Sequence, residues 1–149
     1  MNTLSFKTPF GWITIIEYNN RIRSINFSRQ KNLGKSKNLL NLQKQIIKYC
    51  QGKTKKINTK IELIGTSLQK KIWRELLKIP YGSTKSYGEI AKKVKTSPRY
   101  VGNVCGKNQH LLVVPCHRII KSDGKLGGFS GYGGIKLKNN LLSLEKKNV

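Results

Sequence analysis

Alternating apolar and polar positions near the start of the chain predict β-strands. Three short runs rich in β-branched and aromatic residues occupy residues 4–6, 12–16 and 22–27. Turn-forming residues separate them, at residues 8–11 and again at residues 19–20. This spacing is typical of two successive hairpins. We therefore expect a small antiparallel sheet in this part of the chain.

Further along, apolar residues recur at the helical period of about 3.6. This period predicts a helix over residues 38–51, in which Cys50 lies on the apolar face and is better interpreted as a core residue than as a reactive one. Residues 67–79 and 135–145 predict two more helices, and residues 61–64 fit one more strand. Together these elements predict an α+β fold.

A basic connector at residues 53–60 divides this pattern into two parts. We expect a small N-terminal domain with the antiparallel sheet over residues 1–60 and a mostly helical domain over residues 61–149. The first part contains no combination of residues that suggests chemistry, so we interpret it as a structural domain that braces the second.

The second part contains two short helices with the spacing of a helix-turn-helix. Ser86 and Glu89 have the Ser-x-x-Glu spacing of a capping box, which predicts a helix up to about residue 94. Pro98 then suits the first position of the next helix, where its missing N–H has no consequence. Because many short helix pairs bind nothing, the spacing alone does not establish DNA binding.

The second helix of this pair has one face of small and polar residues. Arg99, Gly102, Asn103 and Gly106 fall on it, opposite an apolar face that includes Cys105, which we expect to be inert. Glycine inside a helix costs about 1 kcal/mol relative to alanine. Such a face therefore suits close approach, either to DNA or to another part of the same protein.

The charge of the chain favours DNA as the partner. Thirty Lys and Arg residues against six Asp and Glu give a net charge of +24. An AT-rich genome would explain abundant lysine but not the scarcity of acids, so we favour nucleic acid over membrane phosphate or solubility alone. No apolar stretch reaches the roughly 20 residues of a membrane span. The first twenty residues lack the features of a signal peptide, and we expect a cytoplasmic protein.

The most distinctive stretch is residues 113–120, where Cys116 and His117 stand together between two apolar runs. The run at residues 111–114 predicts a buried strand that delivers Cys116 to its end. A thiol held in a pocket is a candidate nucleophile once a base or a cation favours the thiolate. Three scattered cysteines and two histidines do not suggest a zinc site, and their odd number favours free thiols.

Three further features bear on this candidate site. Five glycines among residues 127–134 make a loop that we interpret as a pocket wall, with Phe129 or Tyr132 placed to stack on a base. Asn108 suits a turn, or its amide could brace the site. Glu145 is the acid of the last helix and is either solvated or a partner of a histidine.

The Pro-Cys-His-Arg motif with its hydrophobic flanks resembles the core of the O6-alkylguanine-DNA alkyltransferases, also called methylated-DNA–protein-cysteine methyltransferases. The resemblance extends over about residues 66–145 and includes a Gly-Gly-x-x-x-Lys-x-x-Leu-Leu-x-x-Glu pattern that ends at Glu145. It implies irreversible transfer of the alkyl group from O6-alkylguanine in duplex DNA to Cys116, once per protein molecule, after the damaged nucleotide is flipped out. It implies no metal or organic cofactor.

The resemblance also implies catalytic roles for five residues. Cys116, His117 and Glu145 would form a relay that activates the thiol. Asn108 would support the active-site turn, and the Tyr87 hydroxyl would help to protonate the leaving guanine.

On the DNA side, the resemblance implies that Arg99 fills the gap left by the flipped base. The backbone N–H of Ser130 would point at the guanine oxygen. The helix face that contains Gly102, Asn103 and Gly106 would lie along the minor groove. The expected partner is thus duplex DNA containing O6-alkylguanine, bound by a monomer, with no membrane involved.

Three other functions fit parts of the sequence. A non-catalytic module that binds alkylated DNA is the main alternative, and the presence of Cys116 argues against it. A cysteine hydrolase would need Cys116 and His117 in contact, which is awkward on a strand because adjacent side chains point to opposite faces. A basic helix-turn-helix regulator leaves the Pro-Cys-His-Arg motif unexplained.

Overall fold

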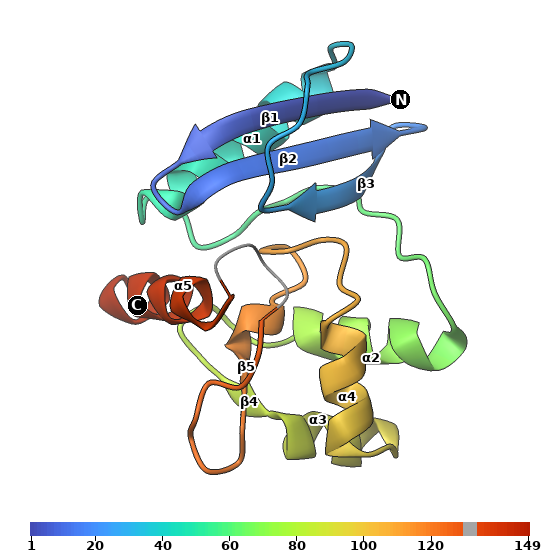
Figure 1. The fold of residues 1–149 in the computed structure, drawn as a ribbon, viewed down its shortest axis with the longest axis vertical. Coiled ribbons are helices and arrows are strands. Elements are labelled where there is room, and N and C mark those ends of the chain that lie inside the picture. Colours follow the sequence, from blue (N-terminus) through green and yellow to red (C-terminus); the bar gives the residue numbers. More distant parts are fainter. Residues whose placement is uncertain (130–133) are drawn as a thin grey trace. The chain divides into compact units, whose positions relative to one another are not determined.

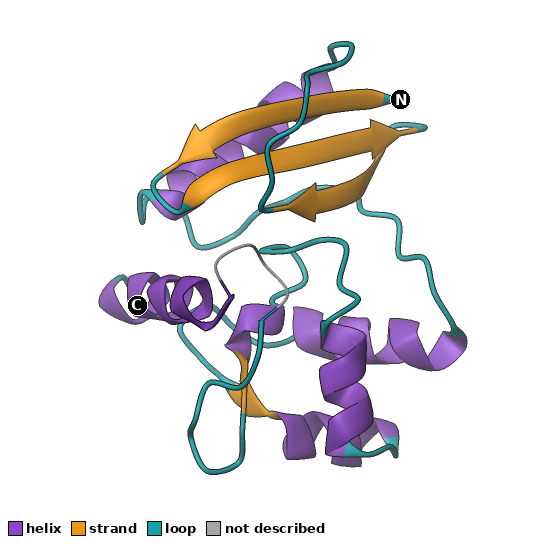
Figure 2. Ribbon diagram, in the orientation of Figure 1, coloured by secondary structure: helices purple, strands orange, loops and turns teal. Residues whose placement is uncertain are grey.

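The computed structural model describes residues 1–129 and 134–149, so the predicted roles of Ser130 and Tyr132 lie outside the described residues. The fold is α+β, with helices and strands distributed as Figure 2 shows. In the described part of the chain, no helix is both long and apolar enough to cross a membrane.

The chain divides by its contacts into two compact units. The first is Met1–Leu63 together with Gln109–Leu111, and the second is Ile64–Asn108 together with Leu112–Val149. Each unit has its own buried apolar residues, and the cysteine-histidine motif belongs to the second.

The first unit is an antiparallel sheet with one helix on it (Figure 1). The strands β1 (Asn2–Thr8), β2 (Gly11–Tyr18) and β3 (Arg21–Asn26) pair in sequence order, and α1 (Lys37–Cys50) packs on β1 and β2. The predicted strands, hairpins and helix are confirmed. Cys50 is 4% exposed, which confirms that it is a core residue.

The prediction of a strand over residues 61–64 is wrong. Ile61 makes a single parallel bridge to Ile22, and His110 makes another to Ile25. Two separate segments thus share the free edge of β3. Because each pairs at one position, neither extends into a strand.

The second unit is mostly helical (Figures 1 and 2). The following elements make it up: α2 (Ser67–Leu77), β4 (Lys85–Ser86), α3 (Tyr87–Val94), α4 (Pro98–Cys105), the 3₁₀ helix η1 (Cys116–Arg118), β5 (Ile119–Ile120) and α5 (Gly134–Lys147). The short strands β4 and β5 pair in parallel and connect the start of α3 to the segment that follows Cys116.

Side-chain caps set the helix-turn-helix boundaries. The Ser86 hydroxyl accepts from Glu89 N at 3.0 Å, and the Glu89 carboxylate accepts from Ser86 N at 3.1 Å, so the predicted capping box is confirmed. Ser97 caps α4 by accepting from Tyr100 N at 3.1 Å. The helices α3 and α4 pack together, and Lys95 turns the chain between them with a φ of 60°.

The predicted strand over residues 111–114 is absent. Leu112 has a φ of 75°, which reverses the chain, and Cys116 N donates to Val114 O at 2.8 Å across Pro115. Residues 111–114 are apolar because they are buried. A short apolar run shows that a segment is buried, but it does not show that the segment is a strand. Cys116 therefore begins a helical turn.

Candidate active site and DNA interface

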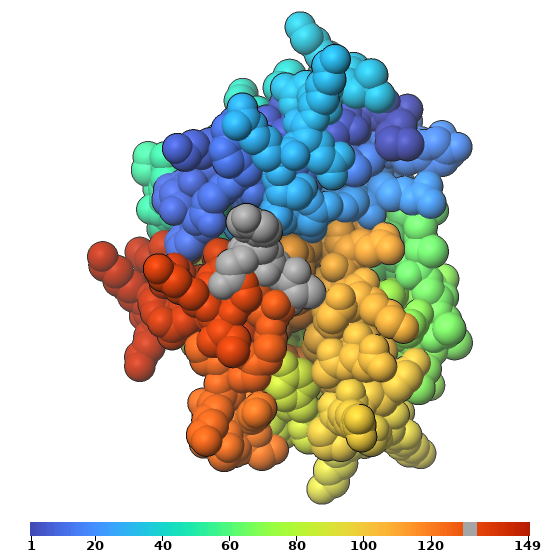
Figure 3. Space-filling model, in the orientation of Figure 1, coloured from blue at the N-terminus to red at the C-terminus, as the bar shows by residue number. Residues whose placement is uncertain are grey.

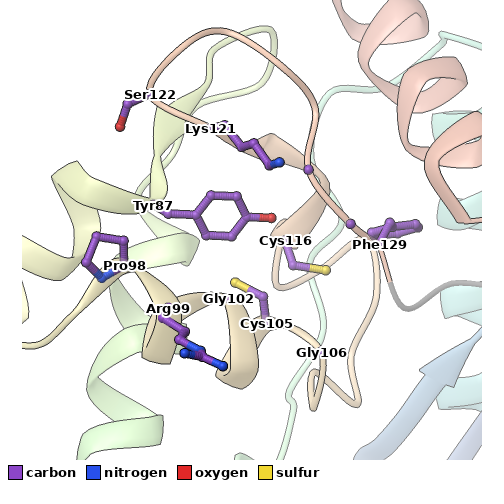
Figure 4. A pocket seen from close by; sticks show the side chains of 12 residues that line it. Tyr87, Pro98, Arg99, Gly102, Cys105, Gly106, Cys116, Lys121, Ser122 and Phe129 are labelled. Atoms are coloured by element: carbon purple, nitrogen blue, oxygen red, sulfur yellow. The ribbon is translucent and has the colours of Figure 1, made fainter.

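A cavity of about 600 Å³ lies in the second unit. Figure 3 shows its opening between α4, in gold, and the orange segment that follows β5, with the yellow-green start of α3 at its base. Five of the predicted site residues line it: Tyr87, Arg99, Gly102, Gly106 and Cys116. Figure 4 shows these residues around the cavity, together with Phe129.

Cys116 is held at the wall of this cavity by a braced turn. The Asn108 side chain donates to Val114 O at 2.8 Å, the same carbonyl that accepts from Cys116 N. The thiol is 3% exposed, and burial raises its pKa to about 11 although Asn108 and Lys138 oppose the shift. The thiol is therefore protonated near neutral pH, and it needs a base to become a nucleophile.

His117 and Glu145 form a fully buried pair. His117 Nε2 lies 2.7 Å from Glu145 Oε2, and neither side chain is exposed. Burial lowers the pKa of His117, and the carboxylate opposes that shift only in part. A neutral imidazole that donates Nε2–H to a carboxylate keeps its lone pair on Nδ1, which is then the basic nitrogen.

Arg118 fixes the other side of this carboxylate, a role that the sequence analysis missed. Its Nε donates to Glu145 Oε1 at 2.8 Å and its Nη2 donates to Glu145 Oε2 at 2.9 Å, so the contact is bidentate. Its Nη1 donates to Ile79 O at 2.8 Å, and Gly82 N also donates to Glu145 Oε1 at 3.2 Å. The acid that orients His117 is thus held from several directions. The signal in the sequence is the arginine directly after the histidine.

Lys138 is a second missed residue, a lysine with no exposed surface. Its Nζ donates to Leu126 O at 2.5 Å and to Gly128 O at 3.2 Å, and it lies 3.4 Å from the Tyr87 hydroxyl. Burial lowers its pKa to about 8. Lys138 therefore ties the segment before Phe129 to α5 and to Tyr87. Positions 138, 141 and 145 share one helix face, which is the signal that could have found it.

Tyr87 stands at the first position of α3 with its hydroxyl at the cavity (Figure 4). Burial raises its pKa to about 12, so it is a hydrogen-bond donor at neutral pH. Gly127, with a φ of 73°, passes close to this ring, since a Cβ there would lie 3.0 Å from the Tyr87 hydroxyl oxygen. A side chain at residue 127 would crowd the tyrosine.

The predicted DNA-facing side of α4 is open. Arg99, Asn103 and Gly106 are exposed, and Gly102 is partly exposed. A Cβ at Gly102 would meet Tyr87 Cε1 at 3.7 Å, which is an ordinary contact. The glycine is therefore not required by tight packing within this unit. Asn103 is on the open face but does not line the cavity.

Cys105, on the other face of α4, is 7% exposed and burial raises its pKa to about 12. It also lines the cavity, which the sequence analysis did not foresee. Within the described residues, no three His, Cys, Asp or Glu side chains come together in a group that could hold a metal ion.

Comparison with known proteins identifies the family. The family model described as the DNA-binding domain of 6-O-methylguanine DNA methyltransferase matches residues 67–147. The methylated-DNA–protein-cysteine methyltransferase of Sulfolobus acidocaldarius is 38% identical over 146 residues, which are 97% of this chain and 92% of that protein. The chain belongs to this methyltransferase family.

Solved methyltransferase structures have the same fold. The O6-methylguanine methyltransferase of Mycobacterium tuberculosis superposes with a TM-score of 0.86 at 32% identity, covering 97% of this chain and 92% of that one. The structure of the same organism's OGT in complex with DNA gives a TM-score of 0.85 at 33% identity, covering 99% of this chain and 94% of that one. The predicted α+β fold is confirmed.

A methyltransferase that modifies its own cysteine needs a thiol at a cavity with a base beside it. Cys50 is buried in the first unit, and Cys105 lines the cavity from α4. Cys116 both lines the cavity and precedes the buried histidine that is paired with Glu145. It is therefore the candidate acceptor.

Proposed function

We propose that this methyltransferase repairs duplex DNA by moving the alkyl group of O6-alkylguanine to Sγ of Cys116, once per protein molecule. The observation that carries the proposal is the position of the Cys116 thiol. It lines a cavity of about 600 Å³, directly before the buried His117–Glu145 pair, in the part of the chain that matches the DNA-binding domain of the family.

The reaction is a single displacement. His117 Nδ1 accepts the thiol proton through a water molecule, because its Nε2 is directed to Glu145. The Cys116 sulfur then forms a bond to the alkyl carbon while the bond from that carbon to guanine O6 breaks. The electron pair stays on guanine, and the Tyr87 hydroxyl donates a hydrogen bond or a proton to the leaving base.

The product limits the protein to one turnover. The new carbon–sulfur bond is a thioether, which water does not readily cleave. Cys105 lines the same cavity, but its pKa of about 12 keeps it a protonated thiol, and a thioether has a poor leaving group. Cys116 is therefore not regenerated.

The base has to leave the double helix to reach Cys116, at a cost of a few kcal/mol. In this proposal the open face of α4 lies along the minor groove, and Arg99 fills the gap left by the nucleotide. Phe129 lines the cavity and can stack on the base. The role of the Ser130 backbone N–H toward the guanine oxygen stays a prediction.

The proposal includes the setting in which the protein works. Residues 61–149 bind DNA and carry the chemistry, and residues 1–60 are a structural domain. The protein acts as a monomer in the cytoplasm, without a cofactor. Its three cysteines are free, which suits a reducing compartment.

Replacement of the acceptor tests this function. Cys116→Ser should abolish methyl transfer from duplex DNA with one O6-methylguanine but keep lesion binding, while the control Cys105→Ser should keep both. Transfer is measured as mass gain and binding as fluorescence anisotropy. Methylation of the Cys116→Ser protein would contradict the assignment. Lesion binding without any transfer by the unaltered protein would support the non-catalytic module.

A further inference from the structure

The cavity carries charge of one sign at its mouth. Arg99 and Lys121 line it and are both exposed, whereas Tyr87 and Cys116 line its deeper part. Among the described residues, no Asp or Glu lines the cavity. A cavity that is cationic at the mouth and uncharged inside fits a ligand with an anionic group outside a neutral ring, as a nucleotide has.

The two cations come from different walls. Arg99 is in the first turn of α4, and Lys121 follows β5 directly. In Figure 4, Lys121 extends over the cavity on the side of the Tyr87 ring opposite Arg99. A nucleotide whose base enters this cavity toward Cys116 therefore meets a cation on each of two walls.

The backbone around Lys121 is fixed at this rim. Lys121 N donates to Lys125 O at 2.8 Å, and Gly124 N donates to Lys121 O at 2.9 Å, closing a tight turn. The carboxylate of Asp123 accepts from Lys125 N at 3.0 Å within that turn. No carboxylate among the described residues forms a salt bridge with Lys121. Its ammonium is therefore available to an anion from outside.

We propose that Lys121 binds a backbone phosphate next to the extruded nucleotide and so holds that nucleotide in the cavity. The inference rests on the proposed function, because it needs a nucleotide whose base reaches Cys116. An ammonium on a flexible stem suits a phosphate oxygen, which can be approached from many directions. Arg99 on the opposite wall remains free for the gap in the duplex.

A pair of matched variants separates this contact from general surface charge. Lys121→Gln and Lys125→Gln remove the same charge from the same turn, and Lys125 does not line the cavity. The proposal predicts that Lys121→Gln slows methyl transfer from a lesion duplex about fivefold at subsaturating DNA, and that Lys125→Gln changes it less than twofold. Equal effects of both variants would overturn the proposal.

Substitution of the phosphate itself locates the contact. Duplexes are made with an uncharged methylphosphonate at one of the two positions flanking O6-methylguanine. At one of these positions, the methylphosphonate should lower the transfer rate of the unaltered protein about fivefold. The same methylphosphonate should not lower the rate of Lys121→Gln, because that variant has already lost the contact, and this completes a double-mutant cycle. If the effects of the methylphosphonate and of Lys121→Gln on the rate multiply at both positions, they are independent, and the proposed contact is wrong.

The free base O6-methylguanine, which has no phosphate, distinguishes the two proposals. Lys121→Gln should react with the free base at the rate of the unaltered protein. A slower reaction would mean that Lys121 acts on the base, which overturns the phosphate role. If the unaltered protein transfers no methyl group from either substrate, the proposed function itself has failed.

Discussion

At the scale of single residues, Cys116 and His117 are both uncharged in the free protein. Burial raises the pKa of Cys116 to about 11 and lowers the pKa of His117 below its usual 6.5. A thiol and an imidazole in this state do not form a standing ion pair. In the proposed reaction the nucleophile is therefore generated by movement of the thiol proton to the imidazole.

This arrangement predicts a flat pH profile for methyl transfer at saturating lesion DNA. Between about pH 6.5 and pH 7.5 the proton moves within the Cys116–His117 pair, and Lys138, whose pKa is about 8, stays mostly charged, so the rate does not change with pH. Below the lowered pKa of His117 the rate falls, because an imidazolium cannot accept a proton.

In His117→Gln, only thiolate that is already formed can react. Its rate should be lower by about 10²-fold or more and should rise about tenfold per pH unit, since the pKa of Cys116 lies far above this range. Single-turnover quenched-flow measurements give both profiles. A wild-type rate that also rises tenfold per unit would show that His117 is not the base.

Lys138 makes the stability of the protein depend on pH in a defined direction. Its pKa is about 8 in the folded protein and 10.5 in the unfolded chain. Between these values the unfolded state binds more protons, so the free energy of unfolding contributed by Lys138 rises with pH. Below about pH 8 the residue is charged in both states, and the burial cost is constant.

We therefore expect the wild type to gain stability relative to Lys138→Met as the pH rises from 8 toward 10.5. Urea denaturation at three pH values measures the difference. The control is Lys146→Met in the last turn of the same helix, where the lysine is exposed and the difference should stay constant. A constant difference for Lys138→Met would contradict the burial of this ammonium.

At the scale of elements, the proposed contact with DNA depends on α4. Its N-terminus is capped by Ser97, and its buried face holds Val101 and Val104, so the opposite face is presented to solvent. Packing within the unit does not require a glycine at position 102, which supports the proposal that this face of α4 meets DNA.

A negative charge on the solvent-facing side of α4 should be repelled by the phosphates of the DNA backbone. We predict that Asn103→Asp weakens binding to duplex DNA about tenfold, and that the same exchange at the exposed Asn140 on α5 changes binding less than twofold. Anisotropy titrations at constant salt measure both. If Asn140→Asp weakens binding as much as Asn103→Asp, the effect is one of net charge, and α4 is not the contacting helix.

The helices could be predicted from the sequence because their signals are local. Residues that start a helix act within one turn, as Ser86 does by capping α3 and Pro98 does at the first position of α4, and apolar residues at a helical period have to be buried on one side. The segments at residues 61–64 and 111–114 could not be predicted correctly. Their conformation depends on which edge of β3 is free and on the positive φ of Leu112, and both are tertiary properties.

The buried cations of the candidate site could not be predicted from local sequence patterns either. Of the thirty Lys and Arg residues, Arg118 and Lys138 are the buried ones, and a basic composition does not tell which cations are buried. Their partners lie between 10 and 51 residues away in sequence and include Glu145, the Ile79 carbonyl and the Tyr87 hydroxyl. The Pro-Cys-His-Arg motif was enough to select Cys116 and His117 as candidates, but the contacts that hold them come from residues distant in sequence.

At the scale of the whole molecule, the net charge of +24 should dominate binding to undamaged DNA. Lysines that contact phosphates release bound cations from the duplex, and each contact lowers the affinity as salt rises. We predict that affinity for an unmodified duplex falls by about a hundredfold or more between 50 and 200 mM salt. Transfer from the free base should change little over the same range, which serves as the control. A fall of less than tenfold would contradict a backbone contact of this kind.

The most direct test of the central claim is the mass of the intact protein after incubation with duplex DNA that carries one O6-methylguanine. We predict the gain of one methyl group and no more at any excess of DNA, and peptide mapping should place it on Cys116. No gain in mass despite lesion binding, or a methyl group on a peptide without Cys116, would contradict the account.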